Sequence, residues 1–435
     1  MHNSVWNENI KLPEFETLRG EKSCDVLIIG GGMCGILCAH LLKQKGIDCL
    51  LVEGEKIAQG VTKNTTAKIT SQHGLIYSKL IKNAGHEKAK MYLDANEKAI
   101  KTFESLCEKI DCDFEKRSAY TYSLLDRQKI ENEVKAVNSL GFKAEFCKTV
   151  ELPFETNGAV CFKNQAQFNP LKFIKEISKD LNIYENTFIT DIDKNTAIAE
   201  NGKIRAKKVI VATHFPFINK HGSYFLKLYQ HRSYVSAYKN AQKIEGMYVD
   251  EDKKGMSFRN YGDLLLIGGG GHRTGKQGGC WQELHRFSKK YYPNAELCYE
   301  WGAQDTMSLD SVPYIGQYSK NTPDLYVATG FDKWGMTSSM VSAQILTDMI
   351  EERKNEYSDV FSPSRSIIKP QLLVNGFETT TNLLTPTTRR CSHLGCALKW
   401  NKYEHSWDCA CHGSRFTENG EVINNPAMKN IKPKE

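Results

Sequence analysis

Two cysteines and two histidines near the C-terminal end have the spacing of metal ligands. Cys391 and His393 form a C-x-H pair, and Cys409 and His412 form a C-x-x-H pair further along the chain. Two thiolates and two imidazoles can bind either a zinc ion or a two-iron cluster. The spacing therefore predicts a metal centre and leaves both metals open.

A glycine cluster near the N-terminal end has the spacing of a dinucleotide-binding turn. Gly30, Gly32 and Gly35 satisfy G-x-G-x-x-G, after an apolar run at 24–29 and before a helical pattern at 36–45. The first glycine allows a tight turn, the second lets a pyrophosphate approach the backbone, and the third lets the helix pack on the strand. The N-terminus of that helix then faces the phosphates.

An acidic residue follows at the distance that this motif needs. Glu53 ends a second apolar run at 48–53, 18 residues after Gly35. A carboxylate at this position can accept hydrogen bonds from the ribose hydroxyls of an adenosine and disfavours a 2′-phosphate. The βαβ pattern predicts an adenine dinucleotide without deciding between FAD and NAD.

Composition places these motifs in a globular chain of more than one domain. The chain has 435 residues, a net charge of +7 and 14 cysteines, and it opens without an apolar leader. Its lysines are scattered, which argues against nucleic acid binding, and the most apolar window, 26–42, is too short and glycine-rich for a membrane span. We therefore expect a cytoplasmic protein whose other ten cysteines are ordinary thiols in a reducing compartment.

The elements between the two motifs alternate between helical and strand-like patterns. Helical patterns cover 80–110, 127–140, 170–181 and 337–352, and strand-like runs cover 119–124, 159–162, 208–212 and 324–329. Alternating apolar residues over 224–271 predict an antiparallel sheet. The range 355–388 is rich in Ser, Pro and Thr and is predicted to be an irregular linker.

The C-terminal motif resembles the Rieske iron-sulfur family closely. The resemblance implies a 2Fe-2S cluster in which Cys391 and Cys409 ligate one iron and His393 and His412 the other. It also implies a disulfide between Cys396 and Cys411, as in one Rieske subfamily. Members of the family usually place several strands before the first ligand loop, so this domain is expected to be N-terminally abbreviated.

The remainder resembles the D-amino-acid-oxidase-like (DAO) FAD-dependent oxidoreductases over roughly residues 24–352. The matching segments are the loop at 60–68, the stretches at 187–189 and 208–213, the segment at 311–316 and the loop at 329–337. The resemblance decides for FAD, and it implies a set of cofactor-binding residues: Gly30, Gly32, Gly35, Glu53, Thr62, Thr65, Thr66, Ile189, Gly330, Gly335, Met336 and Thr337. The pairing with a Rieske segment resembles a bacterial group of FAD-dependent oxidoreductases.

The two resemblances imply a three-part fold. We expect an α/β, Rossmann-like FAD-binding domain, a substrate domain built on an antiparallel sheet, and a small all-β Rieske domain. The predicted boundaries are 1–80, 151–220 and 305–354 for the FAD domain, 81–150 and 221–304 for the substrate domain, 355–385 for the linker and 386–435 for the Rieske domain.

Candidate catalytic residues lie where this fold places substrate over the flavin ring. They are His272, Arg273, Tyr314 and Lys333. Arg273 is able to pair with a substrate carboxylate, and the competing interpretation is that residues 268–275 form a strand-end turn. His73 is a candidate for covalent flavin attachment, although a structural histidine is the favoured interpretation.

The function expected from the two modules is oxidation of a small substrate, such as an amine or amino acid, at FAD. The electrons then pass singly through the 2Fe-2S cluster to an external acceptor, or the flow runs in reverse from an external donor. Two alternatives remain: a redox sensor or electron-transfer protein that uses the cluster and the Cys396–Cys411 disulfide, and a Rieske-type oxygenase component.

Overall fold

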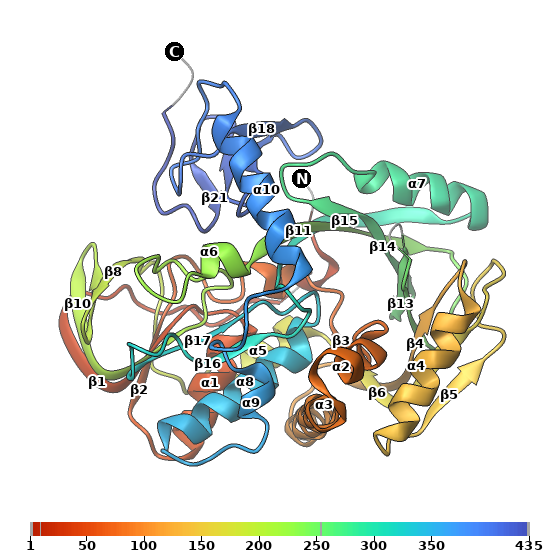
Figure 1. Ribbon diagram of the computed structural model, residues 1–435, viewed down its shortest axis with the longest axis horizontal. Coiled ribbons are helices and arrows are strands. Elements are labelled where there is room, and N and C mark those ends of the chain that lie inside the picture. The colour runs from red at the N-terminus through yellow and green to blue at the C-terminus, as the bar shows by residue number, and fades with distance from the viewer. Residues whose placement is uncertain (1–2, 9, 253–254, 433–435) are drawn as a thin grey trace.

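The computed structural model describes residues 3–8, 10–252 and 255–432. Three sheets organise these residues (Figure 1). The first is mainly parallel, the second is mainly antiparallel, and the third is a small antiparallel sheet near the C-terminal end. The predicted fold class is confirmed by this arrangement.

The first sheet has the order β16-β17-β10-β1-β2-β7, with the hairpin β8-β9 attached to β10. At its centre, β1 pairs in parallel with β2 and β10, and its apolar end, Val26–Ile29, is buried as expected for a strand covered on both faces. Its strands are β1 (Gly20–Ile29), β2 (Cys49–Val52), β7 (Ile183–Tyr184), β8 (Ile189–Asp193), β9 (Thr196–Ala199), β10 (Gly202–Val211), β16 (Tyr314–Gln317) and β17 (Leu325–Thr329).

Helices α1 (Met33–Gln44) and α8 (Gly335–Ile350) pack against each other beside this sheet. The helix α5 (Pro170–Ile177) begins where sequence rules place it, because Asn169 accepts hydrogen bonds from the next two free amides and Pro170 occupies the first turn. The short helices here are η1 (Val5–Asn7), η2 (Val61–Asn64) and α9 (Ser358–Phe361).

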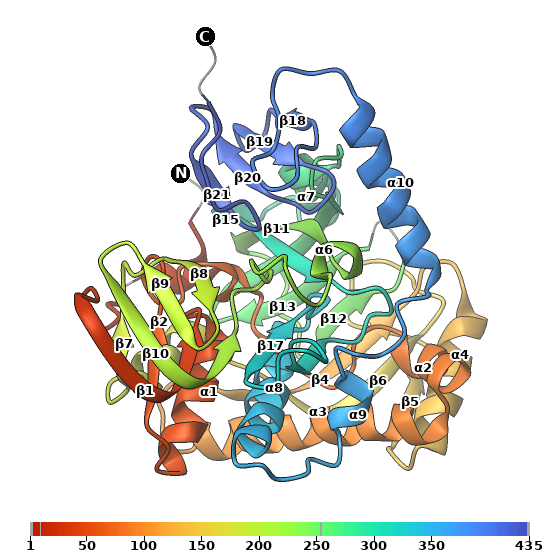
Figure 2. The same cartoon turned by 60° about the vertical axis from the view of Figure 1, so that its left-hand side comes forward.

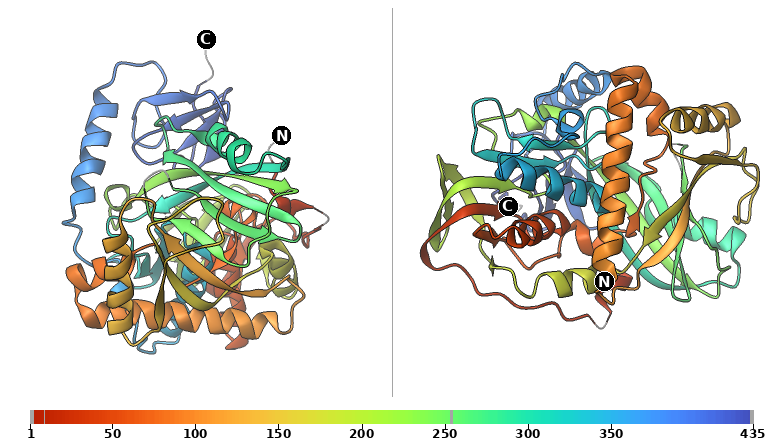
Figure 3. Two further views of the ribbon diagram at one scale, coloured as in Figure 1. Left: turned by 90° about the vertical axis from the view of Figure 1, so that its right-hand side faces the viewer. Right: turned by 90° about the horizontal axis from the view of Figure 1, so that it is seen from below.

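The second sheet has the order β15-β11-β14-β13-β12-β4-β6-β3, with β5 paired to β6. Its strands are β3 (Lys68–Ile69), β4 (Glu115–Tyr122), β5 (Ala144–Cys147), β6 (Ala159–Gln167), β11 (Tyr229–Lys239), β12 (Met247–Asp250), β13 (Ser257–Tyr261), β14 (Leu264–Arg273) and β15 (Glu296–Met307). The associated helices are α2 (Ile76–Ala84), α3 (His86–Cys107), α4 (Arg127–Ser139), α6 (Tyr224–Lys227) and α7 (Cys280–Tyr291). Figure 3 shows α3 running along the base of the molecule. Strands β3 and β6 join this sheet although their residues lie in ranges predicted for the FAD domain.

The third sheet is a meander of β18 (Leu398–Asn401), β19 (Ser406–Cys409), β20 (Arg415–Thr417) and β21 (Val422–Asn424). All four strands follow the first predicted ligand loop. In the described part of the C-terminal domain, the pairing before that loop is a single bridge between Arg390 and Ala397. The sheet therefore has the abbreviated form expected from the sequence.

The range predicted as an irregular linker contains the 15-residue helix α10 (Pro370–Leu384) as well as α9. Pro370 stands in the first turn, where it is tolerated, and no proline follows until residue 386. The helix stands at the edge of the molecule, below and beside the third sheet (Figure 2). Of the helices in the described ranges, none has the length and apolar character needed to cross a bilayer.

Candidate functional site

The glycine turn after β1 is shaped by close backbone contacts. Gly30 has a φ of +113°, and a Cβ there would overlap the carbonyl group of Ala212 on the neighbouring strand. At Gly35 a Cβ would overlap the carbonyl oxygen of Gly30. Both positions require glycine, which supports the expected turn and the close packing of α1 on β1.

The N-terminus of α1 is left open toward a cavity. Gly32 precedes the helix without a side-chain cap, and the amide of Met33 donates to Thr62 Oγ1 at 3.0 Å. Glu53 accepts hydrogen bonds from the amides of Gly31 (2.7 Å) and Glu55 (3.0 Å), while burial raises the pKa of its carboxyl. Open helix amides beside a buried carboxylate fit the pyrophosphate and ribose of a dinucleotide.

The cavity has a volume of about 970 Å³ and extends from this turn to the second sheet. Ten of the predicted cofactor-binding or catalytic residues line it: Gly30, Gly32, Glu53, Thr62, Thr65, Thr66, Ile189, Lys333, Gly335 and Met336. Gly35, Gly330 and Thr337 are not among the residues that line it. The size and the residues present fit the predicted FAD.

A polar group that the sequence did not reveal lines the same cavity. His231 and Asp305 are cross-strand neighbours on β11 and β15, and His214 and Lys333 join them from loops. Burial raises the pKa of Asp305 and lowers that of Lys333, and the opposite charges of the two oppose both shifts. His231 Nδ1 and His214 Nε2 are buried without a hydrogen-bond partner among the described residues. Of these four residues, Lys333 alone is a candidate in the sequence, because the four come from separate segments with no shared spacing.

His73 is held on both ring nitrogens. Its Nδ1 accepts from the Tyr92 hydroxyl at 2.6 Å, and its Nε2 donates to the Thr70 carbonyl at 2.8 Å. The ring stacks on Trp334 with centroids 4.8 Å apart, and burial lowers the pKa of His73 to about 3. These contacts support the structural interpretation of His73 over covalent attachment to a flavin.

Three of the candidate catalytic residues lie outside the cavity lining. Arg273 donates from Nε to the Ala410 carbonyl (3.0 Å) and from Nη2 to the Cys411 carbonyl (3.2 Å). His272 precedes it at the end of β14, so residues 268–273 are strand, and the turn of the competing interpretation is limited to residues 274 and 275. Tyr314 is buried beneath the guanidinium of Arg365, 3.7 Å from its ring centroid. The expected pairing of Arg273 with a substrate carboxylate therefore lacks geometric support.

The two ligand loops of the C-terminal domain, residues 391–396 and 409–414, have the same backbone. Each loop closes with one hydrogen bond from its first amide to its last carbonyl, and one from its glycine amide back to its first carbonyl. These bonds are Cys391 N to Cys396 O, Gly395 N to Cys391 O, Cys409 N to Ser414 O and Gly413 N to Cys409 O, all at 2.9 Å. The repeated turn presents one cysteine and one histidine from each loop.

In both predicted ligand histidines, one ring nitrogen is free and the other is hydrogen-bonded. Both Nδ1 atoms are buried without a partner among the described residues. His393 Nε2 donates to Asn219 Oδ1 at 3.2 Å, and the backbone of Phe225 hydrogen-bonds the His412 ring, which assigns that bond to Nε2. Burial lowers the pKa of His393 to about 4 and that of His412 to about 3. Neutral rings with a free Nδ1 fit iron ligands whose tautomer is fixed from outside.

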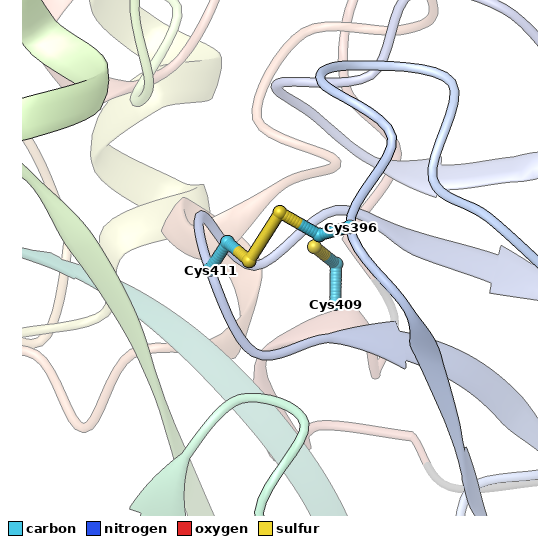
Figure 4. A group of neighbouring side chains, drawn as sticks. All are labelled: Cys396, Cys409 and Cys411. Carbon is cyan, nitrogen blue, oxygen red and sulfur yellow. A yellow bond between two sulfur atoms is a disulfide. The ribbon is translucent and has the colours of Figure 1, made fainter. Parts of the chain in front are cut away.

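The predicted ligand cysteines are free thiols beside a disulfide. Cys396 and Cys411 are bonded, with Cα atoms 6.7 Å apart, and the Cys409 sulfur lies within 4.8 Å of both their sulfurs (Figure 4). A hydrogen bond from Cys409 lowers the pKa of Cys391 to about 7. Two free thiols and two free Nδ1 atoms fit the predicted 2Fe-2S cluster, and the disulfide joins the two loops.

One sheet separates the second ligand loop from the cavity. Gln304 on β15 donates to the Gly413 carbonyl at 2.9 Å, whereas its neighbours Ala303 and Asp305 line the cavity. On β11, Arg232 bonds Glu404 of the C-terminal domain, and its neighbour His231 lines the cavity. Since side chains alternate across a strand, the second ligand loop lies on the face of β11 and β15 opposite to His231 and Asp305. Other residues of the C-terminal domain, between Val422 and Asn430, line the cavity directly.

A buried ionic network fixes the C-terminal domain on this face. Glu404 accepts from Arg232 and Arg415, and Arg415 also donates to Asp408 Oδ1 at 2.9 Å. Burial by itself raises the pKa of Glu404, but the two guanidinium groups outweigh it and hold the pKa at about 2. The charges compensate each other, as buried charges must.

Family comparisons match the two parts of the chain separately. The family described as FAD dependent oxidoreductase matches residues 25–349, and the family described as Rieske [2Fe-2S] domain matches residues 370–434. The putative Rieske 2Fe-2S iron-sulfur protein YhfW of Bacillus subtilis (strain 168) is 34% identical over 492 aligned residues, which cover 99% of this chain and 97% of that protein.

Two solved structures share the fold of the larger part. L-proline dehydrogenase from P. horikoshii superimposes with a TM-score of 0.67 at 16% identity, covering 80% of this chain and 98% of the other. Glycine oxidase from Geobacillus kaustophilus also gives 0.67, at 17% identity, covering 80% of this chain and 100% of the other. At these identities the likeness shows a common fold.

Proposed function

Because the chain belongs to the family of FAD-dependent oxidoreductases and carries a C-terminal Rieske [2Fe-2S] domain, we propose that it oxidises a small amine or amino acid and delivers the electrons singly to an external acceptor. When bound, FAD takes a hydride equivalent from the substrate and the cluster carries one electron at a time. The names of the glycine oxidase and proline dehydrogenase structures support a substrate of this class.

The observation that carries the proposal is the docking of the second ligand loop on the substrate sheet. Gln304 and Arg273 bond carbonyl groups of residues 410–413, and the opposite face of the same sheet lines the cavity. Packed layers of this kind are about 10 Å apart. Electron transfer between the two centres then requires no domain movement.

The polar group on the cavity wall is proposed to prepare the substrate. An amine must be neutral before it can give up a hydride, so a proton acceptor has to lie beside it. Lys333, whose pKa is lowered by burial, and the neutral ring of His231, with its free Nδ1, are the residues placed for this task. Asp305 compensates the charge that Lys333 gains.

The relay is tested by anaerobic reduction of the purified protein. Cofactor analysis should give one FAD, two irons and two sulfides per chain. Amines and amino acids are then mixed with the protein, with flavin absorbance and the electron paramagnetic resonance signal of the reduced cluster followed together. Bleaching of the flavin without a cluster signal would contradict the relay. A Cys391→Ser variant, which lacks one ligand thiolate, serves as the control that should bleach and stay silent.

The role of Lys333 is tested by comparing two lysines of the cavity. Lys333→Met should slow flavin reduction roughly 10²- to 10⁴-fold, the usual contribution of a general base. Lys79 also lines the cavity, but its side chain is two-thirds exposed and paired with Glu251. Lys79→Met should therefore leave the rate nearly unchanged, and equal effects of the two variants would remove Lys333 from the proposed role.

A redox sensor is the second candidate, because Cys409 lies beside the Cys396–Cys411 disulfide. Rapid multiple turnover with an amine and an artificial acceptor would count against it. The oxygenase alternative requires a separate mononuclear iron site. In the described ranges, the group of three close metal-binding side chains is that of the C-terminal cysteines, which gives the oxygenase no such site.

A further inference from the structure

Helix α10 has its polar side against the protein and its apolar side in solvent. Its buried side chains are those of Asn375 and Asn382, whereas Leu373, Phe377 and Leu384 are 78%, 71% and 76% exposed. An amphipathic helix of a globular protein normally shows the opposite arrangement. Figures 2 and 3 show the helix at the periphery, with no described segment outside it.

The inward face is anchored by polar bonds. Asn375 Oδ1 accepts from Arg273 Nη1 at 3.0 Å, Glu378 pairs with Lys276 at 2.7 Å, and the Asn382 carbonyl accepts from Ala397 N at 2.9 Å. The helix is therefore held in this rotation by specific partners on its inner side. Turning the apolar residues inward would break all three bonds.

No segment of the described residues covers the apolar face of α10. A helix of 15 residues is about 22 Å long. Monomeric proteins rarely leave contiguous apolar surface of this kind exposed, so a second molecule is the expected cover.

We propose that a second copy of this chain covers the face, with α10 of one copy packed against α10 of the other. Pro370, Leu373, Phe377, Thr380 and Leu384 follow one another at intervals of 3, 4, 3 and 4 residues. This is the spacing of a helix-pairing seam, narrower than the apolar arc that faces a protein core. The partner of such a seam is another helix.

Charge and space on α10 suit pairing with an identical helix. Glu378 is the one charged residue between 370 and 384, and it is turned inward. The seam flanks, Val374, Gly376, Thr381 and Leu383, carry no charge, so no like charges meet in a symmetric dimer. A Cβ at Gly376 would meet nothing within 4 Å, which leaves room for a close helix approach. A membrane-surface helix would instead carry Lys and Arg on its polar face.

The proposal is tested by the mass of the protein in solution. Multi-angle light scattering of the holoprotein should give twice the 49.3 kDa chain mass. Leu373→Glu and Phe377→Glu should weaken association at least roughly tenfold, because each buries an unpaired charge in the seam. Leu125 offers a matched control, since it is also 78% exposed but lies far from α10 in the sequence, and Leu125→Glu should remain dimeric.

A second measurement locates the contact. Phe377→Cys, in the middle of the seam, should form a disulfide-linked dimer under mild oxidation, whereas Leu125→Cys should not. FAD content and thermal unfolding confirm that each variant is folded. A wild-type protein that stays monomeric up to its solubility limit would overturn the proposal, as would a Leu373→Glu dimer. Monomers that bind anionic phospholipid vesicles through this face would replace the second copy by a lipid surface.

Discussion

The two ligand loops of the C-terminal domain close with the same backbone hydrogen bonds and lie in different surroundings. His412, in the second loop, is 2% exposed and its ring lies 6.3 Å from Phe225, centroid to centroid, while Phe215 lies 6.4 Å from both histidine rings. His393, in the first loop, is half-buried between the exposed residues Ser392 and Leu394. Both histidines thus contact the oxidoreductase body, His412 from a buried position and His393 from a position beside solvent.

This difference suggests a direction for electron flow through the protein. The second loop is bonded to the sheet that lines the cavity, whereas the first loop borders solvent, where the proposed acceptor would bind. The two loops have the same backbone but different contacts, because their surroundings in the fold differ.

The largest effect on stability is expected from substituting Glu404, which pairs with Arg232 on β11 and with Arg415 next to the second loop. Arg415 follows this loop, and it bonds both Glu404 and Asp408, the residue that precedes the loop. Glu404→Gln leaves the buried guanidinium of Arg232 without its carboxylate partner and should lower the free energy of unfolding by about 3–5 kcal/mol. Urea unfolding measures this, with the exposed Glu418→Gln as control. A change in the free energy of unfolding below about 1 kcal/mol would show that this network does not hold the domain in place.

The same residue predicts a dependence of stability on pH. The pKa of Glu404 is about 2 in the folded protein, below its ordinary value of 4.5. A depressed pKa contributes stability that is complete above the unfolded value and is lost as pH falls through the folded one. Wild type should therefore lose about 3 kcal/mol more than Glu404→Gln between pH 5 and pH 2. Parallel stability profiles would contradict this assignment.

The glycines of the two loops provide a matched pair of substitutions. Gly413 and Gly395 have φ values of +85° and +76°, so alanine is strained at both by about 1 kcal/mol. A Cβ at Gly413 would also overlap the side chain of Gln230, whereas a Cβ at Gly395 meets nothing within 4 Å. Gly413→Ala should cost about 2–4 kcal/mol, the excess being overpacking, and should expose the domain to limited proteolysis. Equal costs would contradict the asymmetry.

Local spacing explains what the sequence could predict of this site. The glycine turn, Glu53 and the loops around Cys391 and Cys409 lie within short segments, where the backbone alone brings their residues together. The group of His231, Asp305 and Lys333 comes from separate elements, and only the folded sheet joins them.

The structure departs from two other sequence predictions for the same physical reason. Helix α10 resembled a linker because its buried side chains are asparagines and its apolar ones face solvent, the reverse of the expected pattern. The sequence makes Arg273 a candidate for pairing with a substrate carboxylate because its partners in the structure, the carbonyls of Ala410 and Cys411, are backbone atoms that any sequence supplies.

Arg273 is expected to tune the cluster from the buried side. Its guanidinium bonds two carbonyls of the second loop, and a unit charge about 8 Å away contributes about 2 kcal/mol at an effective dielectric constant of about 20. Arg273→Gln should lower the midpoint potential by roughly 50–100 mV, since 59 mV corresponds to a factor of ten for one electron. Redox titration followed by electron paramagnetic resonance measures this. Lys276→Gln, which removes a partly exposed charge paired with Glu378, is the control that should shift it little.

The smallest effect is expected on the exposed side, at Asn219. This residue is exposed, and its side-chain oxygen accepts from His393 Nε2 at 3.2 Å. After Asn219→Ala, water can take over as acceptor, because the first loop borders solvent, so the hydrogen bond is exchanged and not lost. The free energy of unfolding should change by less than about 1 kcal/mol, and the midpoint potential should move less than in Arg273→Gln. If the two variants shifted the potential equally, the two histidines would have equivalent surroundings and the first loop would lose its distinction as the exit toward an acceptor.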